Sequence, residues 1–190
     1  MTSLSPFPDL AEMQAPGHVE IRRLDAAGAR ALIDGLAAVL ADCVAGGASV
    51  NYMAPFSHDA ARHAFEGMIT DVEHGRRLLL AAFLEGVVVG SVQVVLALPP
   101  NQPHRAEIAK LLVSRSARTQ GIAQSLMERA ETEARAAGKT LLVLDAVTGG
   151  DAERLYTRLG WTGAGVIPGF ALFPDGRPCA TTFFYKRLAV

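Results

Sequence analysis

The sequence predicts one α/β domain built on a mixed, mostly antiparallel, twisted sheet of about seven strands flanked by helices. Three observations support this prediction. A chain of 190 residues, half of them apolar, is long enough to bury one sizeable core. Two strand patterns meet at the short turn Glu85-Gly86, which is typical of a hairpin. The second half then alternates strand and helix patterns and closes with two strands.

The domain is expected to span residues 18–190, after a flexible arm over residues 1–17 that contains three prolines. In the first half, alternation of apolar residues predicts the strands, and a spacing of three to four residues predicts the helices. Ser57 is expected to cap the second helix, after a loop over 48–57. The strands expected here are 18–24, 77–84, 87–98 and 106–113, and the helices are 26–45 and 57–73.

The second half carries the signals of two strand–helix units and a closing hairpin. A nearly all-apolar strand over 140–146 implies burial on both faces. The turn Pro174-Asp175-Gly176 separates the last two strands. The helices expected here are 118–137 and 151–159, the latter capped by Asp151, and the closing strands are 162–173 and 180–188.

Charge and composition exclude several classes of function. The formal net charge of −1 gives no reason to expect nucleic acid or an anionic membrane as a partner. The start of the chain does not resemble a secretory signal, and no apolar run is long enough to span a bilayer, so a cytoplasmic protein is expected. The five histidines and two cysteines, Cys43 and Cys179, show no metal-ligand spacing, so no metal site is expected.

The segment 118–123 has the features of an anion site. It lies between an apolar strand and a long helix, and the first turn of a helix offers backbone N–H groups and partial positive charge. Gly121 lets the backbone approach a bulky anion, and Arg118 can add a charged contact. No P-loop pattern occurs, and the glycines at 163, 165 and 169 do not match a dinucleotide fingerprint.

The pattern Arg118-x-x-Gly121-x-Ala123 resembles the signature of the GNAT acetyltransferases. Five further stretches resemble the tabtoxin-resistance type of that family: 104–113, 142–145, 155–156, 168–176 and 181–186. The resemblance implies that acetyl-CoA binds between two splayed central strands that end near Val113 and Asp145. The cofactor contacts it implies are pantetheine with the backbone of Leu111, Leu112 and Val113, and pyrophosphate with Arg118, Thr119, Gln120, Gly121, Ile122 and Ala123.

Two carboxylates, Glu107 and Asp145, interrupt apolar strands, where a charge is costly unless it is paired or solvated. A carboxylate can remove the proton from an ammonium group, and the resemblance places both residues as base and amine ligand. Glu107 can instead pair with Arg105 or Lys110. By resemblance, Tyr156 assists the leaving thiolate; it is otherwise a core aromatic residue. Neither cysteine lies beside a base, which favours direct attack by the amine.

The predicted function is transfer of an acetyl group from acetyl-CoA to a small-molecule amine, with toxin or antibiotic detoxification as one role. Two alternatives remain open: acetylation of a protein N-terminus or lysine, and a non-catalytic acyl-CoA sensor. The loop 47–57 and the segment 101–105 are expected to build the amine pocket. By resemblance, the protein is a monomer or a homodimer.

Overall fold

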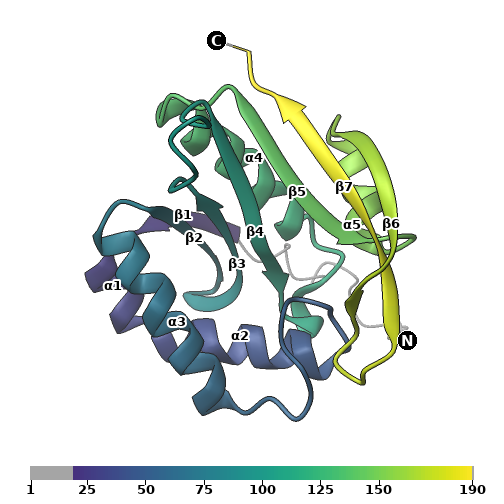
Figure 1. Cartoon of the computed structure of the whole chain (residues 1–190). Helices are drawn as coiled ribbons and strands as arrows, with labels where there is room; N and C mark the ends of the chain where they lie inside the picture. The colour runs from purple at the N-terminus through teal and green to yellow at the C-terminus, as the bar shows by residue number, and fades with distance from the viewer. Residues whose placement is uncertain (1–18, 190) are drawn as a thin grey trace, which may run out of the picture.

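Seven strands form one mixed sheet in the computed structural model, which describes residues 19–189 (Figure 1). They lie in the order β1-β2-β3-β4-β5-β7-β6; the β4–β5 pair is parallel and the other neighbouring pairs are antiparallel. The predicted sheet is therefore confirmed. The arm expected over 1–17 lies outside the described residues. The strands are β1 Val19–Leu24, β2 Arg77–Leu84, β3 Val87–Val95, β4 Arg105–Val113, β5 Leu141–Val147, β6 Thr162–Leu172 and β7 Pro178–Arg187.

Helices cover both faces of the sheet (Figure 1). On one face, Leu36 and Phe65 are fully buried against Leu79 of β2. On the other face, Leu126 packs with Leu142 of β5 in a second apolar cluster. The first face carries α1 (Ala26–Ala31), α2 (Ile33–Ala45) and α3 (His58–Glu73), and the second carries α4 (Ile122–Ala136) and α5 (Asp151–Arg158).

The helix predicted over 26–45 is two helices that meet at Leu32. The Leu32 N–H donates to both Gly28 O and Ala29 O at 3.2 Å, a tightened turn that redirects the axis. The predicted Ser57 cap is confirmed, because its side chain accepts a hydrogen bond from Ala60 N. The predicted Asp151 cap is wrong, because Gly150 is the N-cap of α5 and Asp151 lies in its first turn.

The long strand predicted over 87–98 ends earlier, at Val95. The next two N–H groups, of Leu96 and Ala97, both donate to Arg76 O, so the regular β2–β3 ladder ends there. The helix predicted over 118–137 begins at Ile122 instead. Thr119 (φ 64°) and Gly121 (φ 77°) are left-handed, a conformation that an α-helix cannot include. Within residues 19–189, no helix is long and apolar enough to cross a membrane.

Candidate active site

The two central parallel strands separate partway along their length. Their paired positions end at Glu107 and Val143, whereas β4 continues to Val113 and β5 to Val147. Figure 1 shows the two strands diverging towards the end that faces α2. The edge of β4 from Ile108 onward therefore presents backbone groups that no neighbouring strand satisfies on the β5 side. This is the splayed geometry that the family resemblance implied.

A bulge in β4 lies beside this separation. The β3–β4 register shifts between Ser91 and Gln93, opposite Lys110, which has a φ of 52°. A lysine in the left-handed region is uncommon, and an extra residue in a strand bends it and redirects its side chains. The bulge thus bends β4 where it parts from β5.

The loop before α4 has the geometry of an anion site. Gly121 is the N-cap of α4 in a left-handed conformation, and no side chain caps the helix. By contrast, α1 is capped by Asp25, whose carboxylate accepts from Gly28 N at 2.7 Å. The first-turn amides of α4 begin at Ile122 and have no side-chain acceptor, so they suit the pyrophosphate of an acyl-CoA.

The C-terminal part of α2 holds the start of this loop in place. Asp42 accepts from Arg115 N and Arg115 Nε, both at 2.8 Å, and these contacts lower the pKa of Asp42. Cys43 Sγ donates to Val113 O at 3.5 Å, and Arg118 Nε donates to the same oxygen at 3.3 Å. Segments 70 or more residues apart are therefore joined at the end of β4.

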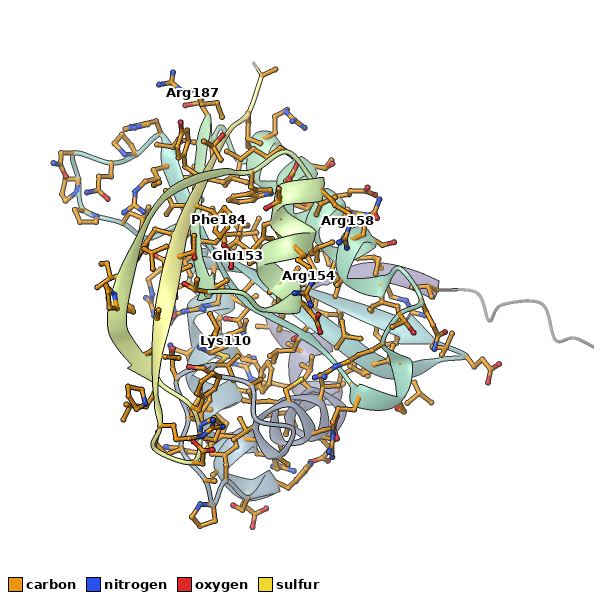
Figure 2. The ribbon with its side chains drawn as sticks, turned by 90° about the vertical axis from the view of Figure 1, so that its right-hand side faces the viewer. Lys110, Glu153, Arg154, Arg158, Phe184 and Arg187 are labelled. Atoms are coloured by element: carbon orange, nitrogen blue, oxygen red, sulfur yellow. The ribbon has the colours of Figure 1, made fainter. Side chains whose placement is uncertain are left out.

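A mixed-charge cluster lies where the strands part. Burial raises the pKa of Asp145, although the residue keeps contact with solvent and the positive charge of Lys110 opposes the shift. Burial lowers the pKa of Lys110 to about 8; Arg77 adds to this shift, and Asp145 and Glu107 oppose it. Lys110 Nζ lies 5.5 Å from the ring centre of Tyr52. Figure 2, viewed from the β6–β7 side, shows Lys110 beside β7 in that view.

Tyr156 belongs to the buried face of α5. Its ring packs edge-on against Phe184 at 5.8 Å and lies 6.0 Å from the ring of Trp161. Burial raises the pKa of its phenol, and the negative charge of Asp145 adds to the shift. Tyr156 is thus both a core aromatic residue, as the alternative interpretation held, and a group within electrostatic reach of the carboxylate cluster.

The structure separates the two segments expected to form the amine pocket. The loop after α2 lies against the β6–β7 hairpin: Ser49 Oγ donates to Leu172 O at 2.7 Å, and Ala54 N donates to Pro174 O at 2.9 Å. The segment 101–105 instead precedes β4, at the end where β4 and β5 are still paired. The loop 47–57, and not the segment 101–105, is therefore placed at the splayed end of the sheet.

Sequence reasoning missed four residues around the separation: Lys110, Tyr52, Phe170 and Phe183. Lys110 carried a signal, because it is a charge within an apolar strand. The aromatic residues lie within segments already singled out, 47–57, 168–176 and 181–186, but aromatic side chains in and around strands are ordinary, so none was named individually. In residues 19–189, no group of three or more histidine, cysteine or acidic side chains could hold a metal ion, and Cys43 and Cys179 are free thiols.

Comparisons with known proteins agree with this geometry. The model of the acetyltransferase (GNAT) family matches residues 48–161, which is more than half of the chain. An uncharacterised N-acetyltransferase from the hisH–hisA intergenic region of Azospirillum brasilense is 33% identical to this chain over 106 residues. The match covers 55% of this chain and 61% of the relative. The alignment thus spans less than two thirds of that relative's length.

Solved structures share the fold. An N-acetyltransferase from Staphylococcus aureus Mu50 superposes with a TM-score of 0.75 at 22% identity, covering 90% of this chain and 99% of that one. An acetyltransferase from Salmonella typhimurium, solved with its cofactor acetyl-CoA, gives 0.73 at 21% identity and covers 91% and 95%. The fold and the family model together define a mixed α/β domain of the acetyltransferase type. The chain belongs to the GNAT acetyltransferase family.

Proposed function

We propose that this protein transfers the acetyl group of acetyl-CoA to the amine of a small molecule, by direct attack in a ternary complex. One observation carries the proposal: the β4–β5 pairing stops at Glu107 and Val143, and the next residue but one on β5 is Asp145. An open strand edge thus lies beside a carboxylate at the place where the family binds acetyl-CoA.

The cofactor contacts follow the residues already described. The unpaired edge of β4 at Leu111, Leu112 and Val113 can take the amide groups of pantetheine, in the manner of an added strand. The pyrophosphate fits the loop and first helical turn formed by Arg118, Thr119, Gln120, Gly121, Ile122 and Ala123. When bound, acetyl-CoA supplies an activated thioester carbonyl.

Asp145 and Glu107 are the proposed proton acceptors. The acceptor amine arrives mostly as an ammonium ion, because an unperturbed alkyl amine has a pKa of about 10. Its proton passes to a carboxylate, directly or through water, and the freed lone pair attacks the carbonyl carbon while the C–S bond breaks. The raised pKa of Asp145 makes it a stronger base than an unperturbed aspartate.

Tyr156 is proposed to donate a hydrogen bond to the leaving sulfur. Because burial and Asp145 raise the pKa of its phenol, the hydroxyl stays protonated at neutral pH. Giving the proton away entirely to a thiolate with a pKa of about 8.5 would be uphill even from an unshifted phenol, by roughly 2 kcal/mol. Stabilisation by a hydrogen bond does not require that transfer.

The acceptor is proposed to be a small molecule because two loops meet over the splayed end of the sheet. Ser49 and Ala54 in the loop after α2 hydrogen-bond to Leu172 and Pro174 of the β6–β7 hairpin. A protein chain lying across the site needs an open channel, which these contacts obstruct. The tabtoxin-resistance type remains the proposed subgroup on its sequence motifs alone, with toxin or antibiotic detoxification as a proposed role.

The deciding experiment measures thiol release from acetyl-CoA with a panel of small amines, amino acids and peptides. Wild type is compared with Asp145→Asn and Glu107→Gln, with Glu66→Gln on α3 as a carboxylate control. Turnover of a small amine should fall by about 10²–10⁴-fold in one or both site variants, with CoA affinity retained. CoA binding without turnover of any amine would instead support the sensor, and preference for peptides would support the protein acetyltransferase.

A further inference from the structure

Two aromatic side chains lie next to the proposed base. Asp145 of β5 is paired with Phe183 of β7, and residues paired across antiparallel strands project from the same face. The ring of Phe170 on β6 contacts that of Phe183 edge-to-face, with centroids 5.1 Å apart and planes at 85°. We call Phe170 and Phe183 the aromatic shelf. Phe170 is 52% exposed, so its ring is accessible to a ligand.

The loop that closes over this end of the sheet adds a second aromatic group. Tyr52 and Phe56 stack with centroids 4.4 Å apart, and Lys110 Nζ lies over the Tyr52 ring. The loop is tied to the hairpin that connects β6 to β7 by the Ser49–Leu172 hydrogen bond. Near Asp145, β6 and β7 thus supply aromatic rings. The strand β4 supplies the cation of Lys110, and the loop supplies the ring of Tyr52.

The charges around Asp145 favour one ammonium group and oppose a second. Glu107 and Asp145 contribute two negative charges, and Lys110 contributes one positive charge. The positive charge of the nearby Arg77 also acts on Lys110; its guanidinium donates to Gln93 and, at 3.2 Å, to Asp71, which pairs with Arg76 as well. A single ammonium group beside the two carboxylates is therefore attracted, whereas further positive charge on the ligand is repelled by Lys110 and Arg77.

We propose that the acceptor is a monocationic amine with an aromatic or similarly sized apolar body. Its ammonium group lies beside Asp145 and its body lies on the aromatic shelf of Phe170 and Phe183. An amino acid would bring a further carboxylate towards Glu107 and Asp145, and a polyamine would place extra charges against apolar rings; both cost desolvation or repulsion. This inference rests on the proposed function, since it names the substrate class of the same site.

The test uses a matched set of amines. 2-Phenylethylamine has the aromatic body and one charge, phenylalanine adds a carboxylate, butylamine lacks the ring, and spermidine adds charges. In the thiol-release assay, kcat/KM for 2-phenylethylamine should exceed that for each of the other three by at least about 10-fold, as expected for burial of an aromatic ring. A preference for phenylalanine or spermidine overturns the inference.

Equilibrium binding of 2-phenylethylamine to the CoA-bound protein separates the two proposals. Binding without turnover of any amine contradicts the transferase but leaves the ligand class standing. Turnover of other amines without binding of 2-phenylethylamine contradicts the ligand class and leaves the transferase standing.

A variant locates the subsite. Phe170→Ala should weaken 2-phenylethylamine binding by about 10-fold while the affinity for CoA is retained; because Phe170 is exposed, the variant should fold. Val87→Ala, at a 65% exposed position at the start of β3, is the control and should change neither. Unchanged amine affinity in Phe170→Ala overturns the subsite. A changed oligomeric state with unchanged amine affinity also overturns it, and assigns Phe170 to a subunit contact.

Discussion

Glu107 of β4 and Val143 of β5 form the last paired position between the two parallel strands of the sheet. On one side of this position the strands share a ladder, and beyond it each has an unsatisfied edge. Asp145 lies two residues further along β5, on the same face of the strand as Val143. The point where backbone pairing stops is therefore also the point where a carboxylate and an open strand edge meet.

The first prediction concerns Tyr156→Phe. Loss of one hydrogen bond to a developing negative charge should lower kcat by about 10–100-fold, while the ring packing against Phe184 and Trp161 is kept. The raised phenol pKa means that this hydroxyl does not ionise near neutral pH, so the shape of the pH profile between about pH 6 and 9 should not change. Rate–pH profiles of both proteins check this. Disappearance of an alkaline limb in the variant would show that Tyr156 titrates and acts as a general acid.

Gly121→Ala should damage the anion site through the backbone. A Cβ here meets no atom within 4 Å, but the φ of 77° should cost about 1–2 kcal/mol of unfolding free energy. Affinity for CoA should fall by roughly 10-fold, measured by titration calorimetry, because strain distorts the amides that are proposed to bind the pyrophosphate. Gly67→Ala on α3 is the matched control, with equal space and no positive φ; it should stabilise the protein by about 0.5–1 kcal/mol and leave CoA binding intact. Equal effects of the two changes would refute the prediction.

Lys110→Met should stabilise the protein at neutral pH. The pKa of Lys110 is lowered from 10.5 to about 8, so between these values the unfolded chain holds more protons than the folded one. The free energy of unfolding therefore rises with pH through this window, and the burial cost is fully present below pH 8. We expect a gain of about 1–2 kcal/mol at pH 7 that shrinks towards pH 10.5, measured by urea denaturation.

Lys110→Arg is the control for this change. Arginine stays positively charged between pH 7 and pH 10.5. The variant should therefore be no more stable than wild type, and its free energy of unfolding should not increase as the pH rises above 8. If Lys110→Met loses stability at pH 7, the electrostatic attraction of Lys110 to Asp145 and Glu107 outweighs the cost of its burial.

Ser49→Ala should loosen the contact between the loop after α2 and the β6–β7 hairpin. It removes the hydrogen bond to Leu172 O, typically worth about 0.5–1.5 kcal/mol. KM for the acceptor amine should rise by about 3–10-fold while KM for acetyl-CoA stays constant, because the cofactor loop lies elsewhere. Thr70→Ala removes a comparable hydroxyl bond within α3 and should alter neither constant. An increase in the acetyl-CoA KM alone would mean that the loop supports cofactor binding instead.

Much of the fold could be read from the sequence because its signals are local. Apolar periodicity located every strand in the described residues, and Ser57 marked the start of α3 through its side chain. The sequence singled out Gly121 because a residue without a Cβ lets the backbone approach an anion, and the structure adds that its φ is 77°. Helix boundaries were less accurate. The break at Leu32 and the late start of α4 depend on how each turn packs, and composition does not encode that.

By itself, the sequence determined the order of the elements, the glycine within the segment 118–123, and the two carboxylates in apolar strands. Only the tertiary structure decided that Asp145 lies opposite Phe183, that Lys110 occupies a bulge, and that the loop after α2 meets the β6–β7 hairpin. The physical reason is the distance along the sequence over which each kind of interaction acts. Periodicity and turn preference act over a few residues, whereas register and loop contacts join residues as distant as Ser49 and Leu172, and they are set by the packing of the whole sheet.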